Sequence, residues 1–84
     1  MQIHQQATLA LKYMVQFRQT GSVEAIADHL CTDNQVAISV MKYLLRRRIS
    51  WFTTVTAPNG VNTFVITPKH IENVIKFLDN GGFK

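Results

Sequence analysis

The chain has a single cysteine, Cys31, which excludes an internal disulfide and any zinc site built from several cysteines. Its histidines (His4, His29 and His70) are not paired at i, i+4, and no acidic residue stands beside them at metal-ligand spacing. We therefore expect surface or capping histidines, with no metal and no cofactor. Cys31 falls in a turn between two expected helices, where a small, half-buried residue fits better than a redox group.

Long hydrophobic runs are also missing. The apolar stretches span only a few residues, far short of the roughly 20 needed to cross a bilayer, so we expect no membrane partner. The first residues, MQIHQQATLALK, lack the basic region of a signal peptide, which predicts a cytoplasmic protein. No glycine-rich phosphate loop, carboxylate pair or Ser/Cys–His–Asp set appears, which argues against an enzyme. A chain of 84 residues, 46% of them hydrophobic, suits a single domain over residues 1–84.

Acidic residues are few, and none lies between Asp33 and Glu72. That interval holds only cations: Lys42, Arg46, Arg47, Arg48 and Lys69. The net charge is +4, and the isoelectric point is near 9.7. A positive field concentrated in one part of a small chain favours a polyanionic partner, nucleic acid before an anionic membrane surface.

The segment 22–49 is typical of two short amphipathic helices joined by a tight turn. Ser22 suits the N-cap of the first, and Thr32 with Gln35 has the spacing of a capping box at the start of the second. Apolar residues recur every three or four positions and predict one buried side on each helix: Val23, Ile26, Ala27 and Leu30, then Ala37, Val40, Met41 and Leu44. Together with a polar, basic outer side on the second helix, this is the pattern of a helix-turn-helix.

Further elements flank this segment. A first helix is expected from about His4 to Gln19, with a core stripe of Ala10, Tyr13, Met14 and Phe17. Leu9, Leu11 and Val15 lie on other faces of it, which either form a dimer contact or are covered by the C-terminal helix. After residue 50 the hydrophobic period becomes two, in WFTTVT and VNTFVIT around the turn APNG, which predicts a β-hairpin. Thr67 and Pro68 should begin a last helix that buries Ile71, Val74, Ile75 and Leu78, and the chain should fray at Phe83. The expected fold is mainly α with a small β-hairpin (α+β).

In this order of elements, the chain from Leu9 to Leu78 resembles the winged helix-turn-helix transcriptional regulators of bacteria and their phages. The residues that carry the resemblance are AIADHL and NQVAISVMKYLLRRRI in the two motif helices and WFTTVTAPNGVNTFVIT in the wing. LALKYM, SVEAIADHL and APNGVNTFVITP are similar to a subfamily that holds iron–sulfur clusters, but its cysteines are absent here. TDNQ and the small size are similar to regulators of pilus operons.

The resemblance implies a cytoplasmic, nucleoid-associated regulator that binds double-stranded DNA sequence-specifically. The recognition helix would read bases in the major groove through one set of side chains: Asn34, Gln35, Ile38, Ser39 and Lys42. Phosphates would be held by a second set: Thr32, Arg46, Arg47 and Arg48. The wing would meet the backbone or minor groove through Asn59, Gly60 and Asn62. A homodimer formed through the first or last helix would bind a palindromic site.

The same residues have other interpretations. The three arginines also fit a solvated helix end stabilised by the helix dipole, and one of them is expected to pack its stem on Trp51 or Phe52. A winged helix can instead serve as a protein–protein module, presenting Ile38, Tyr43 and Leu45. A binder of single strands or RNA would use Trp51 and Phe52 as stacking platforms. A role in DNA architecture would use the same fold as a regulator.

Overall fold

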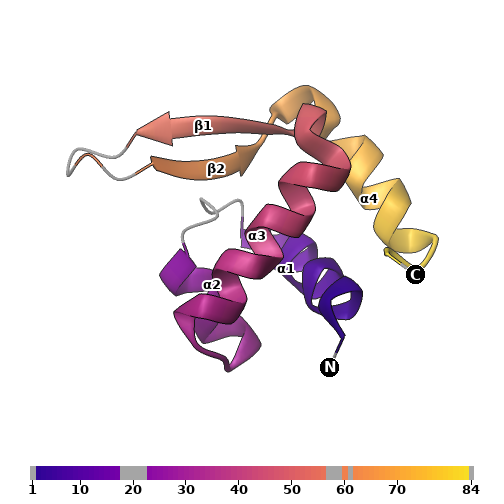
Figure 1. Cartoon of the computed structure of the whole chain (residues 1–84). Helices are drawn as coiled ribbons and strands as arrows, with labels where there is room; N and C mark the ends of the chain where they lie inside the picture. The colour runs from indigo at the N-terminus through magenta and orange to yellow at the C-terminus, as the bar shows by residue number, and fades with distance from the viewer. Residues whose placement is uncertain (1, 18–22, 57–59, 61, 84) are drawn as a thin grey trace.

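Four α-helices and a two-stranded antiparallel sheet form the described part of the chain, residues 2–17, 23–56, 60 and 62–83 of the computed structural model (Figure 1). The helices are α1 (Ile3–Phe17), α2 (Val23–Leu30), α3 (Asn34–Arg48) and α4 (Ile71–Asp79). The strands are β1 (Phe52–Thr56) and β2 (Asn62–Ile66), and 3-10 turns η1 (Ile49–Trp51) and η2 (Pro68–His70) precede β1 and α4. The mainly helical α+β class predicted from the sequence is confirmed.

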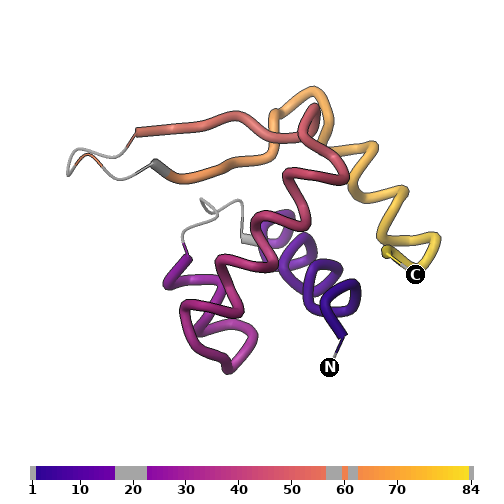
Figure 2. Tube along the Cα trace, viewed as in Figure 1, coloured from indigo at the N-terminus to yellow at the C-terminus, as the bar shows by residue number. Residues whose placement is uncertain are grey.

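The core lies where α1, α2 and α3 pack together, and α4 closes one side of it. Its buried apolar residues are Ala7, Ala10, Leu11, Met14, Ile26, Ala27, Ala37, Val40, Met41, Leu44 and Val74. The stripe predicted for α3 is therefore confirmed in full. The trace in Figure 2 shows α3 running from the end of α2 to the base of the hairpin, so the core supports this helix along its length.

Leu11, which lies outside the predicted core stripe of α1, is fully buried, because α1 contacts α2, α3 and α4. This agrees with the alternative in which the C-terminal helix covers the extra apolar face of α1. One prediction about the core is wrong. On α4, Ile75 is 40% exposed, and Phe77 packs against the core in its place. When a helix is apolar over a wide surface, the sequence does not predict which of its apolar residues a neighbouring element will bury.

The turn between α2 and α3 is closed by the backbone. Cys31 takes the left-handed conformation, with φ of 55°. The Cys31 N–H donates to the Asp28 carbonyl (3.2 Å), and the Thr32 N–H donates to the Ala27 carbonyl (3.0 Å), which is the paired ending usually built on glycine. This geometry leaves the cysteine side chain exposed, so the expectation of a half-buried Cys31 is wrong.

The start of α3 also differs from the prediction. Asp33, not Thr32, is the N-cap residue, and its Oδ1 accepts a hydrogen bond from the Val36 N–H at 2.9 Å. The helix begins one residue later than a Thr32 cap requires, because the Thr32 N–H is already used to close α2. The corresponding prediction for α2, a cap by Ser22, lies outside the described residues.

The hairpin pairs β1 with β2 in antiparallel register, with Phe52 opposite Ile66 and Val55 opposite Thr63. The Thr63 hydroxyl donates to the Val55 carbonyl across the ladder (3.1 Å). An isolated hairpin is marginally stable in water, so it needs a hydrophobic surface to rest on. Phe52, Phe64 and Ile66 pack against the helical core and supply this contact at the base of the hairpin.

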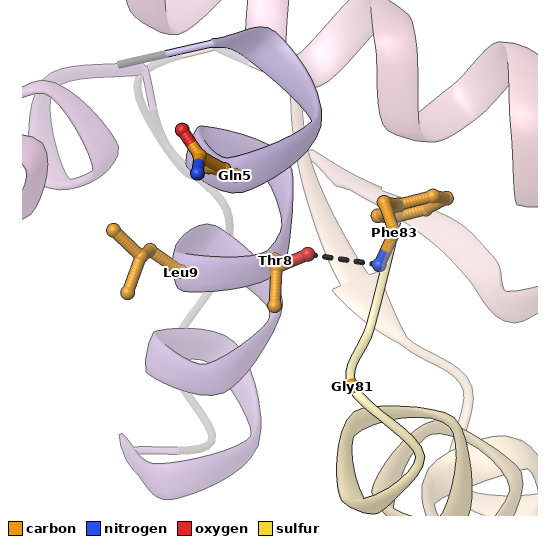
Figure 3. Close-up of a pocket in the computed structure, with 5 residues that line it drawn as sticks. All are labelled: Gln5, Thr8, Leu9, Gly81 and Phe83. Atoms are coloured by element: carbon orange, nitrogen blue, oxygen red, sulfur yellow. Dashed lines mark hydrogen bonds between the residues drawn. The ribbon is translucent and has the colours of Figure 1, made fainter.

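The C-terminal segment is tied down. Pro68 begins η2, so α4 starts at Ile71 rather than directly after Thr67. Beyond α4, the Phe83 N–H donates to Thr8 Oγ1 on α1 at 3.0 Å (Figure 3). The Phe83 ring lies edge-on to Tyr43 and Phe77, at centroid distances of 5.2 and 4.8 Å. The expectation that Phe83 frays is therefore wrong.

Candidate nucleic-acid interface

One side of α3 is exposed along its whole length. Gln35, Ser39, Lys42 and Arg46 recur at intervals of four, three and four residues, so they form a single line, here called the outer line, and all four are exposed. They lie opposite the buried stripe that fixes α3 on the core. Because α3 is held by that stripe, the outer line presents its side chains from a rigid support. Within the described chain no segment covers it.

The outer line is chemically mixed. The Ser39 hydroxyl donates to the Gln35 carbonyl (3.2 Å), which leaves its oxygen free to accept, and the Gln35 amide remains available as a donor and an acceptor. Asn34 is exposed at the start of the helix, and Ile38, 40% exposed, flanks the line. All five predicted base-reading residues are exposed, but Asn34, one residue before Gln35, points about 100° away from the outer line. Amide, hydroxyl, ammonium and apolar groups are those that read base edges in a major groove.

Charge changes sign along α3. Asp33 is the N-cap residue, directly before the first turn, and the last turn carries Arg46, Arg47 and Arg48. Both charges are favourable for the helix dipole, so they also stabilise α3 itself. An anionic partner is therefore attracted most strongly to the C-terminal end of α3, next to the hairpin. Thr32, at the opposite end, is half-buried, and its N–H is used within the protein.

The three arginines point in different directions, as a spacing of about 100° per residue requires. Arg46 lies on the outer line and contacts no ring, carboxylate or hydrogen-bond acceptor among the described residues. Arg47 lies over the Tyr43 ring, 5.1 Å from its centroid. Arg48 lies over both Trp51 and Phe77, at 5.4 Å from each centroid. The expectation that one arginine packs on Trp51 agrees with this geometry.

The predicted wing residues are only partly described. Gly60 is exposed with φ of +83°, a conformation that suits glycine at a hairpin tip. Asn59 lies outside the described residues, and Asn62 is described only through its backbone pairing with Thr56. The two strands extend away from the helical core (Figure 1).

Aromatic side chains pack around the basic end of α3, and among them Phe77 was not expected from the sequence. Trp51 meets Phe77 edge-on, with centroids 5.3 Å apart, and Tyr43 is packed beside Phe83. Trp51 and Phe52 are both half-buried against the core. Stacking platforms for single strands need open ring faces, so this packing weakens that interpretation. Two phenylalanines after residue 76, Phe77 and Phe83, were the only sign of this packing in the sequence. Which residues they contact follows only from the tertiary structure.

Other chemistry finds little support in the described part of the chain. No group of three or more His, Cys, Asp or Glu side chains is placed to hold a metal ion there. Among the same residues, no helix combines the length and apolar character needed to cross a membrane. Comparison of the chain with protein-family models, curated proteins and solved structures found no match.

Proposed function

We propose that this chain is a winged helix-turn-helix domain that binds double-stranded DNA sequence-specifically, as a transcriptional regulator of a bacterium, plasmid or phage. One observation carries the proposal: a 15-residue helix, fixed to the core by a buried stripe, exposes an uncovered line of Gln35, Ser39, Lys42 and Arg46. α3 would lie in the major groove. The hairpin β1–β2 would then reach the neighbouring backbone or minor groove as the wing.

The division of roles follows from the positions. Gln35 and Ser39, with Asn34 and Ile38 beside them, would contact base edges, and Lys42 would reach guanine acceptors from the same line. Arg46 and Arg47 would contact phosphates near the end of α3, where no acidic residue is close in sequence. Thr32 could add only its hydroxyl. A homodimer would present two such helices to a palindromic site, because one small module buries little surface on DNA.

Selection of binding sites from a random duplex pool at two salt concentrations tests the proposal. We expect a defined sequence to be enriched, and binding to weaken steeply with salt. Gln35→Ala should then cost about 1–3 kcal/mol at one base pair only, since it removes one base contact. Arg46→Ala should weaken binding to all sequences alike and lower the salt slope by about 1.

Lys76→Ala is the matched control for Arg46→Ala. Lys76 is an exposed cation on α4, so its loss lowers the net charge equally without touching the outer line. If Lys76→Ala and Arg46→Ala changed the slope equally, general charge rather than α3 would be responsible. Absence of duplex binding by the folded protein at low salt would end the proposal.

A second candidate function is supported by exposed apolar side chains on α3 and directly after it. Ile49 is 72% exposed and Ile38 40% exposed, and exposed large apolar side chains favour a protein partner. Of the residues expected to serve such a module, Tyr43 is instead half-buried beneath Arg47. Ile49→Ser separates the two functions, since Ile49 is assigned no contact with DNA: the change should leave DNA binding nearly intact but weaken a protein interface.

A further inference from the structure

The chain leaves α3 through an abrupt bend at Arg48. Its backbone angles are φ −144° and ψ 52°, outside the helical region, and the η1 turn follows at once. Because φ is negative, no glycine is needed at this bend. The hairpin begins only four residues later, at Phe52, so the conformation around Arg48 determines how the hairpin leaves the helix.

The Arg48 side chain spans this bend. Its guanidinium carbon is 5.4 Å from the centroid of Trp51 in η1 and 5.4 Å from that of Phe77 in α4. One of its nitrogens, Nη1, donates to the Arg47 carbonyl at 3.0 Å. The two rings also contact each other edge-on at 5.3 Å. One side chain thus connects the end of α3, the base of the hairpin and α4.

Arg48 is placed on a different side of α3 from Arg46. It follows Met41 by seven residues and Leu44 by four, so it lies on the side of the buried stripe rather than on the outer line, and its own side chain is exposed. Arg46 starts on the opposite side and contacts none of these rings. The identical side chains of the RRR sequence therefore have different surroundings, fixed by the turn of the helix.

Trp51 is the residue through which both ends of the hairpin are held. It directly precedes β1, and its carbonyl accepts a hydrogen bond of 2.8 Å from the Thr67 N–H, just after β2. A strand rises about 3.4 Å per residue, so a five-residue strand spans about 17 Å. A rotation of about 10° at its base would move its tip by roughly 3 Å, comparable with the length of a hydrogen bond.

We infer that Arg48 is a positioning residue: it fixes the angle between α3 and the hairpin and is not a phosphate ligand. The planar guanidinium can face two rings at once, which the ammonium of lysine cannot reproduce. The consequence for DNA rests on the proposed function, because the angle decides whether the hairpin tip meets the duplex while α3 occupies the groove. The angle itself is a property of the protein alone.

The first experiment therefore uses the protein without DNA. Residual dipolar couplings measure the orientation of β1–β2 relative to α3, and acrylamide quenching measures access to Trp51, the only tryptophan. We expect Arg48→Lys and Arg48→Ala to reorient the hairpin and increase quenching. Arg46→Lys and Arg46→Ala, the matched controls, should change neither. An unchanged orientation in both Arg48 variants, or loss of folding in Arg48→Lys, would overturn the inference.

The second experiment measures duplex affinity across a range of salt concentrations. Arg48→Ala should weaken binding about tenfold at every salt concentration, because the wing is misplaced, with a salt slope unchanged from the wild type. Arg46→Ala should lower the slope by about 1. A slope lowered equally by Arg48→Ala, with the hairpin unmoved, would make Arg48 a phosphate ligand. If the wild type bound no duplex, the proposed function would fail while the first experiment still decided the role of Arg48.

Discussion

At the residue scale, Gly82 in the C-terminal segment lies directly against the Thr8 side chain on α1. Gly82 has φ of +72°, and a Cβ placed on it would lie 2.6 Å from Thr8 Oγ1 and would also overlap Thr8 Cγ2. Thr8 in turn donates to the His4 carbonyl (2.9 Å) and accepts the Phe83 N–H. The missing side chain lets the C-terminal segment reach α1, so Phe83 can insert its ring beside Tyr43.

Gly82→Ala should lower the free energy of unfolding through both the backbone angle and the clash with Thr8. Gly60→Ala isolates the first effect, since Gly60 also has positive φ (+83°) but nothing lies within 4 Å of its added Cβ. We expect a loss of about 1 kcal/mol for Gly60→Ala. Gly82→Ala should lose about 2 kcal/mol more, from the forced overlap. Equal losses in urea denaturation would show that the contact with Thr8 is unimportant.

At the scale of elements, α3 depends on its two ends in different ways. Its C-terminal end is followed by the bend at Arg48, whereas its N-terminal end is closed by the Asp33 carboxylate on the Val36 N–H (2.9 Å). The N–H of Thr32, one residue earlier, donates to the Ala27 carbonyl at the end of α2, so Thr32 does not cap α3. A single short turn thus divides its residues between two helices.

Asp33→Ala should destabilise the protein by about 1 kcal/mol, because it removes the side-chain acceptor at the N-cap. Asp33→Asn keeps an equivalent acceptor and should be close to neutral. Thr32→Ala should also be nearly neutral, although the capping box predicted from the sequence would give it the larger effect. Thermal unfolding of the three variants checks this order, and a greater loss for Thr32→Ala than for Asp33→Ala would contradict it.

At the scale of the whole molecule, the outer line of α3 and the open surface of α1 point away from each other. α1 packs against the buried side of α3, so its exposed residues lie on the far side of the core. There a shallow groove between α1 and α4 is lined by Lys12, Val15, Gln16, Ile75, Leu78 and Asp79. A second copy bound in this groove would leave both α3 helices free for DNA, as the proposed homodimer requires.

Ile75→Asp tests whether this groove forms the dimer. In a two-fold dimer the substitution is present in both protomers, so the free energy of self-association should become less favourable by about 2 kcal/mol or more. Ile3→Asp is the matched control, since Ile3 is 39% exposed, close to the 40% of Ile75, and lies outside the groove. Sedimentation equilibrium measures both variants. A wild type that stays monomeric at high concentration would rule out this arrangement.

Much of the local structure was predictable because short-range patterns determine it. The stripe from Ala37 to Leu44 gave the buried side of α3, and with it the exposure of Gln35, Ser39 and Lys42. The alternation of residues in WFTTVT and VNTFVIT gave the hairpin. The periods of 3.6 and 2 are set by backbone geometry, so they can be read without knowing what the element packs against.

Only the tertiary structure decided which apolar residues at the edges of a helix are buried and what surrounds each arginine. Leu11 is buried and Ile75 exposed because neighbouring helices cover one edge of an apolar surface and not the other. Arg46 and Arg48 are the same residue type, and only Trp51 and Phe77, brought together by folding, give Arg48 its own surroundings. Sequence by itself determined the elements and the side each one buries. Contacts between residues far apart in the chain decided which exposed groups are free to act, because those contacts depend on how the elements are placed in space.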